Sequence, residues 1–237
     1  IEDYVYFIAR DDVYYYNDII DLPVVREAST AIVRPEIYYF DNPEYYYNFN
    51  TIASFNIFED DDKVNAKTFM IGSSDTIYVS KDNIYIAYRK NLPYVYYEAS
   101  NEKRFFEVVV PLLPSKFQSK IKDIQEGNGL TSYEKWESVS AVLEDMYNNL
   151  EEDEKDELIE KIGNAIEEYE TKLQVERSKT VIHKIKINKG SIEYGSRGEV
   201  PGYLLNQFSM DEHENYLRVA TTMEFWGSSP VPLPAVE

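Results

Sequence analysis

The chain has 237 residues, a formal net charge of −19 and no cysteine. The charge argues against nucleic-acid binding, because neutralising phosphates requires a surplus of Lys and Arg, and it also disfavours an anionic membrane surface. Without cysteine there is no disulfide, no thiol nucleophile and no thiolate metal site.

The first part of the chain reads as short strands. Aromatic residues make up 15% of the sequence and include 22 Tyr, and Tyr favours pleated, half-buried surfaces. Residues 4–16 predict a β-hairpin that turns at Arg10–Asp12, and residues 17–36 read as a loop. Further strands are expected over residues 37–40, 51–58 and 67–71.

The pattern of the opening hairpin recurs later in the chain. Residues 75–88 repeat the order Asp, any residue, β-branched residue, Tyr, so that Tyr78 follows Tyr6 by 72 residues. A weaker third copy lies at residues 215–220. Recurrence of one small β unit at a long period predicts a repeat architecture built from small sheets.

Helical periodicity interrupts this series. Thr131 and Glu134 have the spacing of a capping box, and apolar residues then recur at helical intervals over residues 136–150 and 158–173. The short acidic link between the two stripes predicts an antiparallel helical hairpin. Residues 131–178 contain 15 acidic and 5 basic residues, which gives just over half of the net charge.

We expect the chain to be organised around residues 198–222, where two β-type segments flank a polar corner. After the alternating strand expected at 180–188 and a second at 191–194, this stretch suggests a junction between neighbouring sheets. Six of its residues are expected to tie backbone groups at the corner as a structural motif. They are Asn206, Gln207, Ser209, Asp211, Glu212 and Arg218.

The same corner invites a catalytic interpretation. Ser209, Asp211 and His213 share one face of an extended segment, because side chains alternate along a strand. A working triad needs its members to converge, whereas these are spaced along the strand, and the sequence has no Gly-x-Ser-x-Gly elbow. We therefore assign no catalytic residue and keep an exported hydrolase, using carboxylates near Asp211 and Glu212, as the alternative.

Metal sites are weakly indicated, and no cofactor is assigned. The acidic run Glu59–Asp62 could bind calcium through oxygen ligands, but it lacks the spacing of an EF-hand loop and is expected to be a solvated turn. Asp211, Glu212 and Glu214 form a second, weak calcium candidate. His183 shares a face with apolar residues and is expected to be a core histidine rather than a zinc ligand.

Two surface features have competing interpretations. The tyrosine runs, such as Tyr14–Tyr16 and Tyr45–Tyr47, are expected to pack in sheets, with an aromatic platform for sugars or peptides as the functional alternative. The helical hairpin is expected to be a solvent-exposed insertion that packs onto the propeller through its apolar stripes. The alternative is that it forms an acidic arm that docks a partner protein.

Several segments resemble a prokaryotic, largely archaeal family of secreted proteins with a β-propeller domain distantly related to WD40 repeats. The segments are Thr180–Lys184, Gly198–Gly202, Leu205–Glu212 and Arg218–Thr222, together with the opening hairpin and residues 73–88. The resemblance implies export to the cell surface or the medium. It implies no reaction and no ligand.

The expected fold is mostly β, with β-propeller-like blades and an inserted antiparallel helical hairpin. Residues 1–130 would form blades, 131–178 the hairpin and 179–237 further blades. Only two to three sheets can be counted, so a partial propeller is expected, a piece of a larger one whose exposed sheet edges a partner chain could cover.

The expected function is an extracellular or cell-surface binding or scaffold module without catalytic activity. Its partner would be a protein or a cell-surface polymer, and neither nucleic acid nor a membrane span is expected. Besides the exported hydrolase, a surface-layer component stabilised by calcium is a third interpretation, which the response of the melting temperature to calcium would test.

Overall fold

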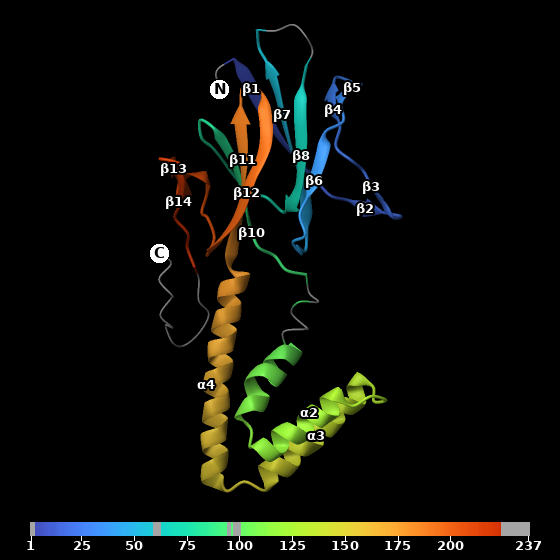
Figure 1. Cartoon of the computed structure of the whole chain (residues 1–237), viewed down its shortest axis with the longest axis vertical. Coiled ribbons are helices and arrows are strands. Elements are labelled where there is room, and N and C mark those ends of the chain that lie inside the picture. Colours follow the sequence, from blue (N-terminus) through green and yellow to red (C-terminus); the bar gives the residue numbers. More distant parts are fainter. Residues whose placement is uncertain (1–2, 59–62, 94–95, 97–100, 224–237) are drawn as a thin grey trace. The chain divides into compact units, whose positions relative to one another are not determined.

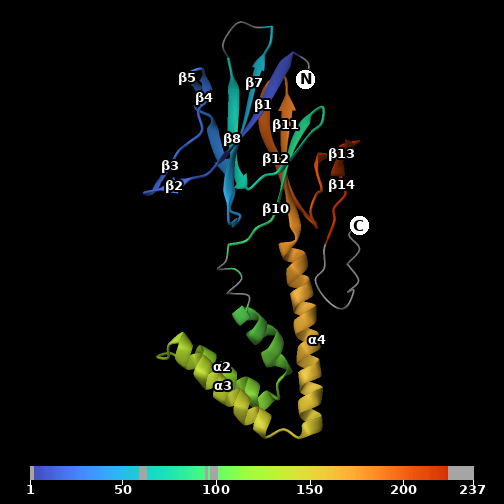
Figure 2. The same cartoon turned by 180° about the vertical axis from the view of Figure 1, so that it is seen from behind.

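The computed structural model describes residues 3–58, 63–93, 96 and 101–223. It divides into two compact units, one formed by residues 1–93 and 175–237 and the other by residues 94–174. We call them the β unit and the helical unit (Figures 1 and 2). The chain is mostly β, as predicted, and no sheet among the described residues closes into a ring. None of the described helices is long and apolar enough to cross a membrane.

The first sheet of the β unit has the strand order β1-β7-β8-β6. Its strands are β1 (Tyr4–Asp12), β7 (Tyr47–Asn56), β8 (Asn65–Gly72) and β6 (Glu36–Tyr39). The β1–β7 and β7–β8 pairs are antiparallel, whereas β6 runs parallel to β8. This mixed order differs from the simple meander of a propeller blade.

The second sheet has the order β12-β11-β10-β9 and is antiparallel throughout. Its strands are β9 (Thr76–Val79), β10 (Asn83–Arg89), β11 (Lys179–Asn188) and β12 (Ser191–Pro201). Neighbours in space are therefore neighbours in chain order, as in a four-stranded blade. The helical unit interrupts this meander between β10 and β11. The predicted hairpin at residues 75–88 is confirmed as β9 and β10.

Three two-stranded hairpins complete the β unit. They are β2 (Tyr15–Tyr16) with β3 (Ile19–Ile20), β4 (Val25–Glu27) with β5 (Thr30–Val33), and β13 (Met210–His213) with β14 (Tyr216–Val219). The β13–β14 turn has positive φ at Glu214 (52°) and Asn215 (67°). Two such residues are what a tight two-residue hairpin requires.

The main core lies between the two large sheets. Ile52, Phe69 and Ile71 come from the first sheet, and Ile84, Ile86, Val181 and Ile185 are among those from the second. This is face-to-face packing of two sheets whose inner side chains interdigitate. A smaller cluster, which includes Tyr85, Ile182 and Met210, lies on the other face of the second sheet under β13 and β14.

The helical unit contains a π-helical turn (Phe105–Val109), a 3-10 turn (Val110–Leu112) and the helices α2 (Ser115–Glu126) and α3 (Ser132–Asn148), followed by α4 (Glu152–Arg177). The predicted capping box is present, because the Thr131 side chain accepts from the Glu134 N–H while the Glu134 carboxylate accepts from the Thr131 N–H. Phe117, Ile121, Val139 and Met146 form the centre of this unit's own core.

The helical region begins earlier than residue 131, where it was expected to start. Phe117, Ile121 and Ile124 form a further apolar stripe at helical spacing, and they place α2 within a range expected to be β. Helices α3 and α4 follow one another across a short link, but α3 packs against α2. An antiparallel hairpin of α3 with α4 is therefore not confirmed.

The predicted opening hairpin is wrong. Strand β1 continues through Arg10–Asp12 and pairs along its whole length with β7. Two of the three polar residues have side-chain partners there: Arg10 donates to the Ser74 carbonyl, and Asp12 accepts from the Asn48 amide. Residues read as a charged turn are thus the hydrogen-bonded end of a strand.

The predicted equivalence of Tyr6 and Tyr78 is also wrong. Tyr6 packs against the core between the two large sheets, and its hydroxyl accepts from the Gly190 N–H (2.8 Å). Tyr78 packs against the cluster on the opposite face of the second sheet, and its hydroxyl accepts from the Glu212 N–H (3.1 Å). The two residues share a sequence pattern but occupy different environments.

Candidate functional site

The polar corner at residues 206–209 forms a single turn of 3-10 helix (Gln207–Ser209). The Asn206 side chain accepts a hydrogen bond from the Phe208 N–H (2.9 Å), and the Ser209 carbonyl accepts one from the Ala220 N–H (2.8 Å). Gln207 begins the turn and is exposed. Contacts of this kind satisfy backbone groups locally.

Asp211, Glu212 and Arg218 lie on the β13–β14 hairpin. Glu212 accepts from the Asn83 amide (2.8 and 3.1 Å) and lies 3.8 Å from Lys184 Nζ. Burial acts to raise the pKa of Glu212, but the nearby hydroxyls of Ser80 and Tyr85, the Asn83 amide and the Lys184 charge outweigh it and lower the pKa. Glu212 therefore attaches the β13–β14 hairpin to the second sheet through these contacts.

The candidate catalytic and calcium-binding carboxylates of this hairpin lie apart from one another. Asp211 is exposed and faces Arg218 (3.9 Å), whereas Glu212, its neighbour on the strand, points to the other face. Glu214 pairs with His213 (3.7 Å). The described residues contain no group of three His, Cys, Asp or Glu side chains placed to hold a metal. The candidate calcium run at residues 59–62 lies outside the described part of the chain.

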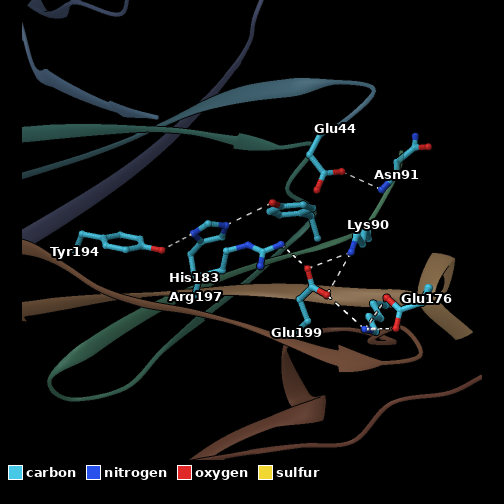
Figure 3. A network of polar contacts seen from close by, with 10 residues as sticks. Glu44, Lys90, Asn91, Glu176, His183, Tyr194, Arg197 and Glu199 are labelled. Atoms are coloured by element: carbon cyan, nitrogen blue, oxygen red, sulfur yellow. Dashed lines mark hydrogen bonds and ion pairs between the residues drawn. The ribbon is translucent and has the colours of Figure 1, made fainter. Parts of the chain in front are cut away.

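A buried polar network crosses one end of the β unit (Figure 3). His183 is buried, as predicted, and its ring nitrogens lie 3.1 Å from the Tyr194 hydroxyl and 3.4 Å from that of Tyr88. Burial, reinforced by the Arg197 charge, lowers the pKa of His183 from 6.5 to about 4. The ring is therefore a neutral core group at neutral pH.

Glu44 joins this network from the segment before β7. Its side chain is only 5% exposed, and one carboxylate oxygen accepts from the Asn91 N–H (2.9 Å). The other oxygen lies near the Tyr88 side chain without a well-formed hydrogen bond, and the Nε of Arg197 is also unpaired. Burial raises the pKa of Glu44, although Asn91 and the charges of Lys90 and Arg197 oppose this shift.

The charged end of the network is formed by β12 and the two chain segments that lead to and from the helical unit. Glu199 Oε1 lies 3.3 Å from Lys90 Nζ and also pairs with Arg197, while Lys179 is 3.7 Å from Glu199 and 2.6 Å from Glu176. Burial acts to raise the pKa of Glu199, but Arg197 and Lys90 overcome it and lower the pKa. The Lys90 N–H donates to the Lys179 carbonyl (2.9 Å).

This network is best explained as a structural element that holds neighbouring strands of the β unit together. Its three cations and its carboxylates connect β10, β11 and β12 where the chain departs and returns. Two cavities of the β unit, of about 1000 and 640 Å³, are not lined by residues of this network. Sequence reasoning identified only His183, because Glu44, Lys90 and Glu199 are far apart in the chain and carry no local pattern.

Most of the tyrosine runs are on the surface, contrary to their expected place in the sheets. Seven tyrosines of the β unit are more than half exposed: Tyr14, Tyr15, Tyr16, Tyr39, Tyr45, Tyr46 and Tyr216. Tyr45 and Tyr46 contact each other edge to face at 4.5 Å. Tyr47 is the exception, since its hydroxyl donates to the Asn42 carbonyl (2.7 Å) and accepts from the Glu44 N–H (3.0 Å).

A groove of about 1000 Å³ lies on the outer face of the first sheet. Its floor is formed by alternate residues of β1 and β7, such as Phe7, Ala9, Ala53 and Phe55, and its wall by the β4–β5 hairpin. Phe7 and Phe55 stack at 5.7 Å, and Phe7 is 55% exposed. The groove is a mostly apolar surface of the size of ligand sites in proteins.

Two archaeal proteins have sequences similar to this chain. The chain is 33% identical over 170 residues to uncharacterized protein MJ1554 of Methanocaldococcus jannaschii, covering 69% of this chain and 26% of that protein. It is 31% identical over 157 residues to an uncharacterized protein of Archaeoglobus fulgidus, covering 65% of this chain and 24% of the relative. The chain thus spans about a quarter of the length of these relatives.

No solved structure matches the chain significantly. The family model described as "Beta propeller domain" matches residues 1–232, which is nearly the whole sequence. The chain therefore belongs to the β-propeller domain family.

Proposed function

We propose that this chain is a binding or scaffold module of a β-propeller protein that acts outside the cell or at its surface. Its partner is a protein or a cell-surface polymer. Propeller folds have many unrelated functions, so membership of the family does not by itself indicate an activity. The proposal has to rest on the surface that the β unit presents.

The observation that carries the proposal is the exposure of aromatic side chains in the β unit. Aromatic residues are enriched at contact surfaces, and tyrosine combines an apolar face with a hydroxyl that suits wet interfaces. Tyr14, Tyr15 and Tyr16 lie consecutively on the surface, and Tyr45 and Tyr46 form an exposed pair. The groove beside β1 adds further apolar area.

The hydrolase alternative is not favoured by the geometry. It required carboxylates near Asp211 and Glu212 to share a site, with one of them raised in pKa. Asp211 and Glu212 lie on opposite faces of β13, and the pKa of Glu212 is lowered.

Binding to envelope material tests the proposal. Immobilised cell-surface polymers and proteins from the source organism would be titrated with the wild-type chain and with a variant in which Tyr14, Tyr15 and Tyr16 are replaced by Ser. We expect saturable binding that weakens about tenfold or more, because each stacked aromatic ring contributes on the order of 1 kcal/mol.

Tyr133→Ser provides the matched control. Tyr133 is also exposed (72%) but belongs to the helical unit, so its loss should leave binding unchanged. An absence of binding by the wild-type chain, or equal loss in the control, would refute the proposal. Detection of the protein in the medium or envelope fraction, rather than in the cell lysate, tests its location.

A further inference from the structure

Strand β1 forms an edge of the first sheet, and its first six residues lack the usual protection. Edge strands expose unpaired N–H and C=O groups, and proteins limit this hazard with short strands, charges, proline or bulges. Strand β1 has nine residues, pairs with β7 in an unbroken register and contains no proline. Its first six residues carry no charge. The structure describes no strand on its other side.

The other three edges of the two large sheets are protected. Strands β6 and β9 have only four residues each. Strand β12 is longer, but its charged residues Glu193, Arg197 and Glu199 are spread along it rather than gathered at one end, it ends at Pro201, and its register is irregular opposite Lys184 and Ile185. Strand β1 is thus exceptional among the four edges.

The hydrogen-bond pattern indicates which groups of β1 face outward. The Asp3 carbonyl accepts from the Ile57 N–H, and the Val13 N–H donates to the Tyr47 carbonyl. Odd-numbered residues of β1 therefore pair with β7, and the even-numbered residues between them direct their N–H and C=O groups to the opposite side. Ile8 and Arg10 offer such groups in the middle of the strand.

The groove extends this edge into a binding surface. Phe7, Ala9 and Asp11 of β1 line the groove, and all three project from the outer face of the first sheet. A strand added beside β1 would place alternate side chains next to Phe7 and Ala9. Addition of a strand combines backbone hydrogen bonds, which give affinity, with side-chain sites, which give specificity.

Charge indicates the chemistry of the added strand. The chain has a net charge of −19, and Asp11 and Asp12 lie at the carboxyl end of β1. Arg10, the one cation of β1, already donates to the Ser74 carbonyl. A second copy of this chain would bring an equal negative charge to the edge. A segment with cationic residues would instead complement it.

We propose that the β1 edge and the adjoining groove bind an extended peptide segment of a partner protein by antiparallel strand addition. The segment alternates apolar and polar residues, and its amino-terminal residues are cationic because they lie beside Asp11 and Asp12. This inference rests on the proposed binding function and names the surface and the class of partner.

Fluorescence anisotropy with a labelled peptide tests the inference. The probe consists of two arginines followed by alternating valine and threonine. We expect saturable binding in the micromolar range for the wild-type chain. A probe of the same charge and length with proline at alternate positions should bind about tenfold or more weakly, since proline cannot donate to the ladder.

Ala9→Lys tests the protein side, because a charge at the groove beside the edge opposes strand addition. It should weaken binding about tenfold or more. Tyr39→Lys adds the same charge on the opposite edge of the same sheet and should leave binding unchanged. Phe7→Lys, at an exposed position, replaces Ala9→Lys if circular dichroism shows that the latter does not fold.

Three results would overturn the inference: no binding of the probe, equal binding of the proline probe, or a wild-type dimer that Ala9→Lys converts to a monomer. The last result would identify a second copy as the occupant. Tyrosine-dependent binding to envelope material without peptide binding would refute strand addition alone. Peptide binding without envelope binding would refute only the proposed location.

Discussion

His183 and Glu44 are buried ionisable side chains with opposite effects on stability. The pKa of His183 is lowered in the folded protein, so its contribution to stability is lost as pH falls. The pKa of Glu44 is raised, so its contribution is present below its ordinary value of 4.5 and is lost as pH rises through its folded value. Both belong to the network at the end of the β unit.

Replacing His183 by Gln should flatten the acid side of the stability curve. Between pH 6.5 and about 4 the unfolded chain binds a proton at His183 that the folded chain does not, which costs roughly 3 kcal/mol when complete. Urea unfolding at pH 7 and at pH 4 would measure the difference. His213→Gln, at an exposed position, is the matched control. An equal loss of stability in wild type and His183→Gln would contradict the assignment.

Gly72 leaves room for the Tyr88 ring. A Cβ at this position would lie 2.3 Å from Cε2 of Tyr88, which is itself almost fully buried. Gly72→Ala should therefore lower the free energy of unfolding by about 1–3 kcal/mol, the usual cost of overpacking. Gly198→Ala, in β12 with nothing within 4 Å, should have little effect. Equal stability of the two variants in urea unfolding would refute this packing argument.

At the scale of the elements, local signals predicted α3 well. The capping box at Thr131 and Glu134 determines where α3 begins, and hydrogen bonds from Thr131 lower the pKa of Glu134. Short-range pairing of this kind depends only on residues three positions apart. Strand β1, by contrast, pairs with β7 more than thirty residues away.

Thr131→Ala should destabilise α3 by about 1 kcal/mol, because the Glu134 N–H loses its side-chain acceptor. The melting transition of the helical signal in circular dichroism would measure the change. Ser138→Ala serves as the control, since the Ser138 hydroxyl only donates to a carbonyl within the helix. If the two variants melt alike, the capping box does not stabilise the helix.

At the scale of the whole molecule, the helical unit interrupts a β-hairpin. Strands β10 and β11 pair up to Arg89 and Thr180, and the Lys90 N–H donates to the Lys179 carbonyl just beyond them. The ends of the interruption are therefore hydrogen-bonded to each other. The β unit and the helical unit also have separate cores.

Replacing residues 92–178 by a single glycine should leave the β unit folded. The new sequence, Lys90-Asn91-Gly-Lys179, supplies an Asn-Gly turn, which suits a two-residue hairpin loop. It also keeps the Asn91 N–H that Glu44 accepts. We expect a cooperative urea transition with strand-type circular dichroism. A variant with Pro in place of Asn91 in the same deletion is the control and should be less stable. A non-cooperative transition would show that the β unit depends on the helices.

Features that arise from residues close together in the chain were predictable from the amino-acid pattern alone. These include the abundance of strand, the β9–β10 hairpin, the capping of α3 and the burial of His183 among alternating apolar residues. Each depends on hydrogen bonds or side-chain periodicity within a few positions, so the local pattern is sufficient.

Segments with similar sequence patterns occupy different environments, and only long-range packing distinguishes them. This packing placed Tyr6 and Tyr78 in different cores, continued β1 through Arg10–Asp12 and left the tyrosine runs exposed. It also brought Glu44 to Asn91 and Glu199 to Lys90 across the chain. The physical reason is that strand pairing and buried charge depend on partners distant in sequence, and a local pattern does not specify which partner a strand or charge will meet.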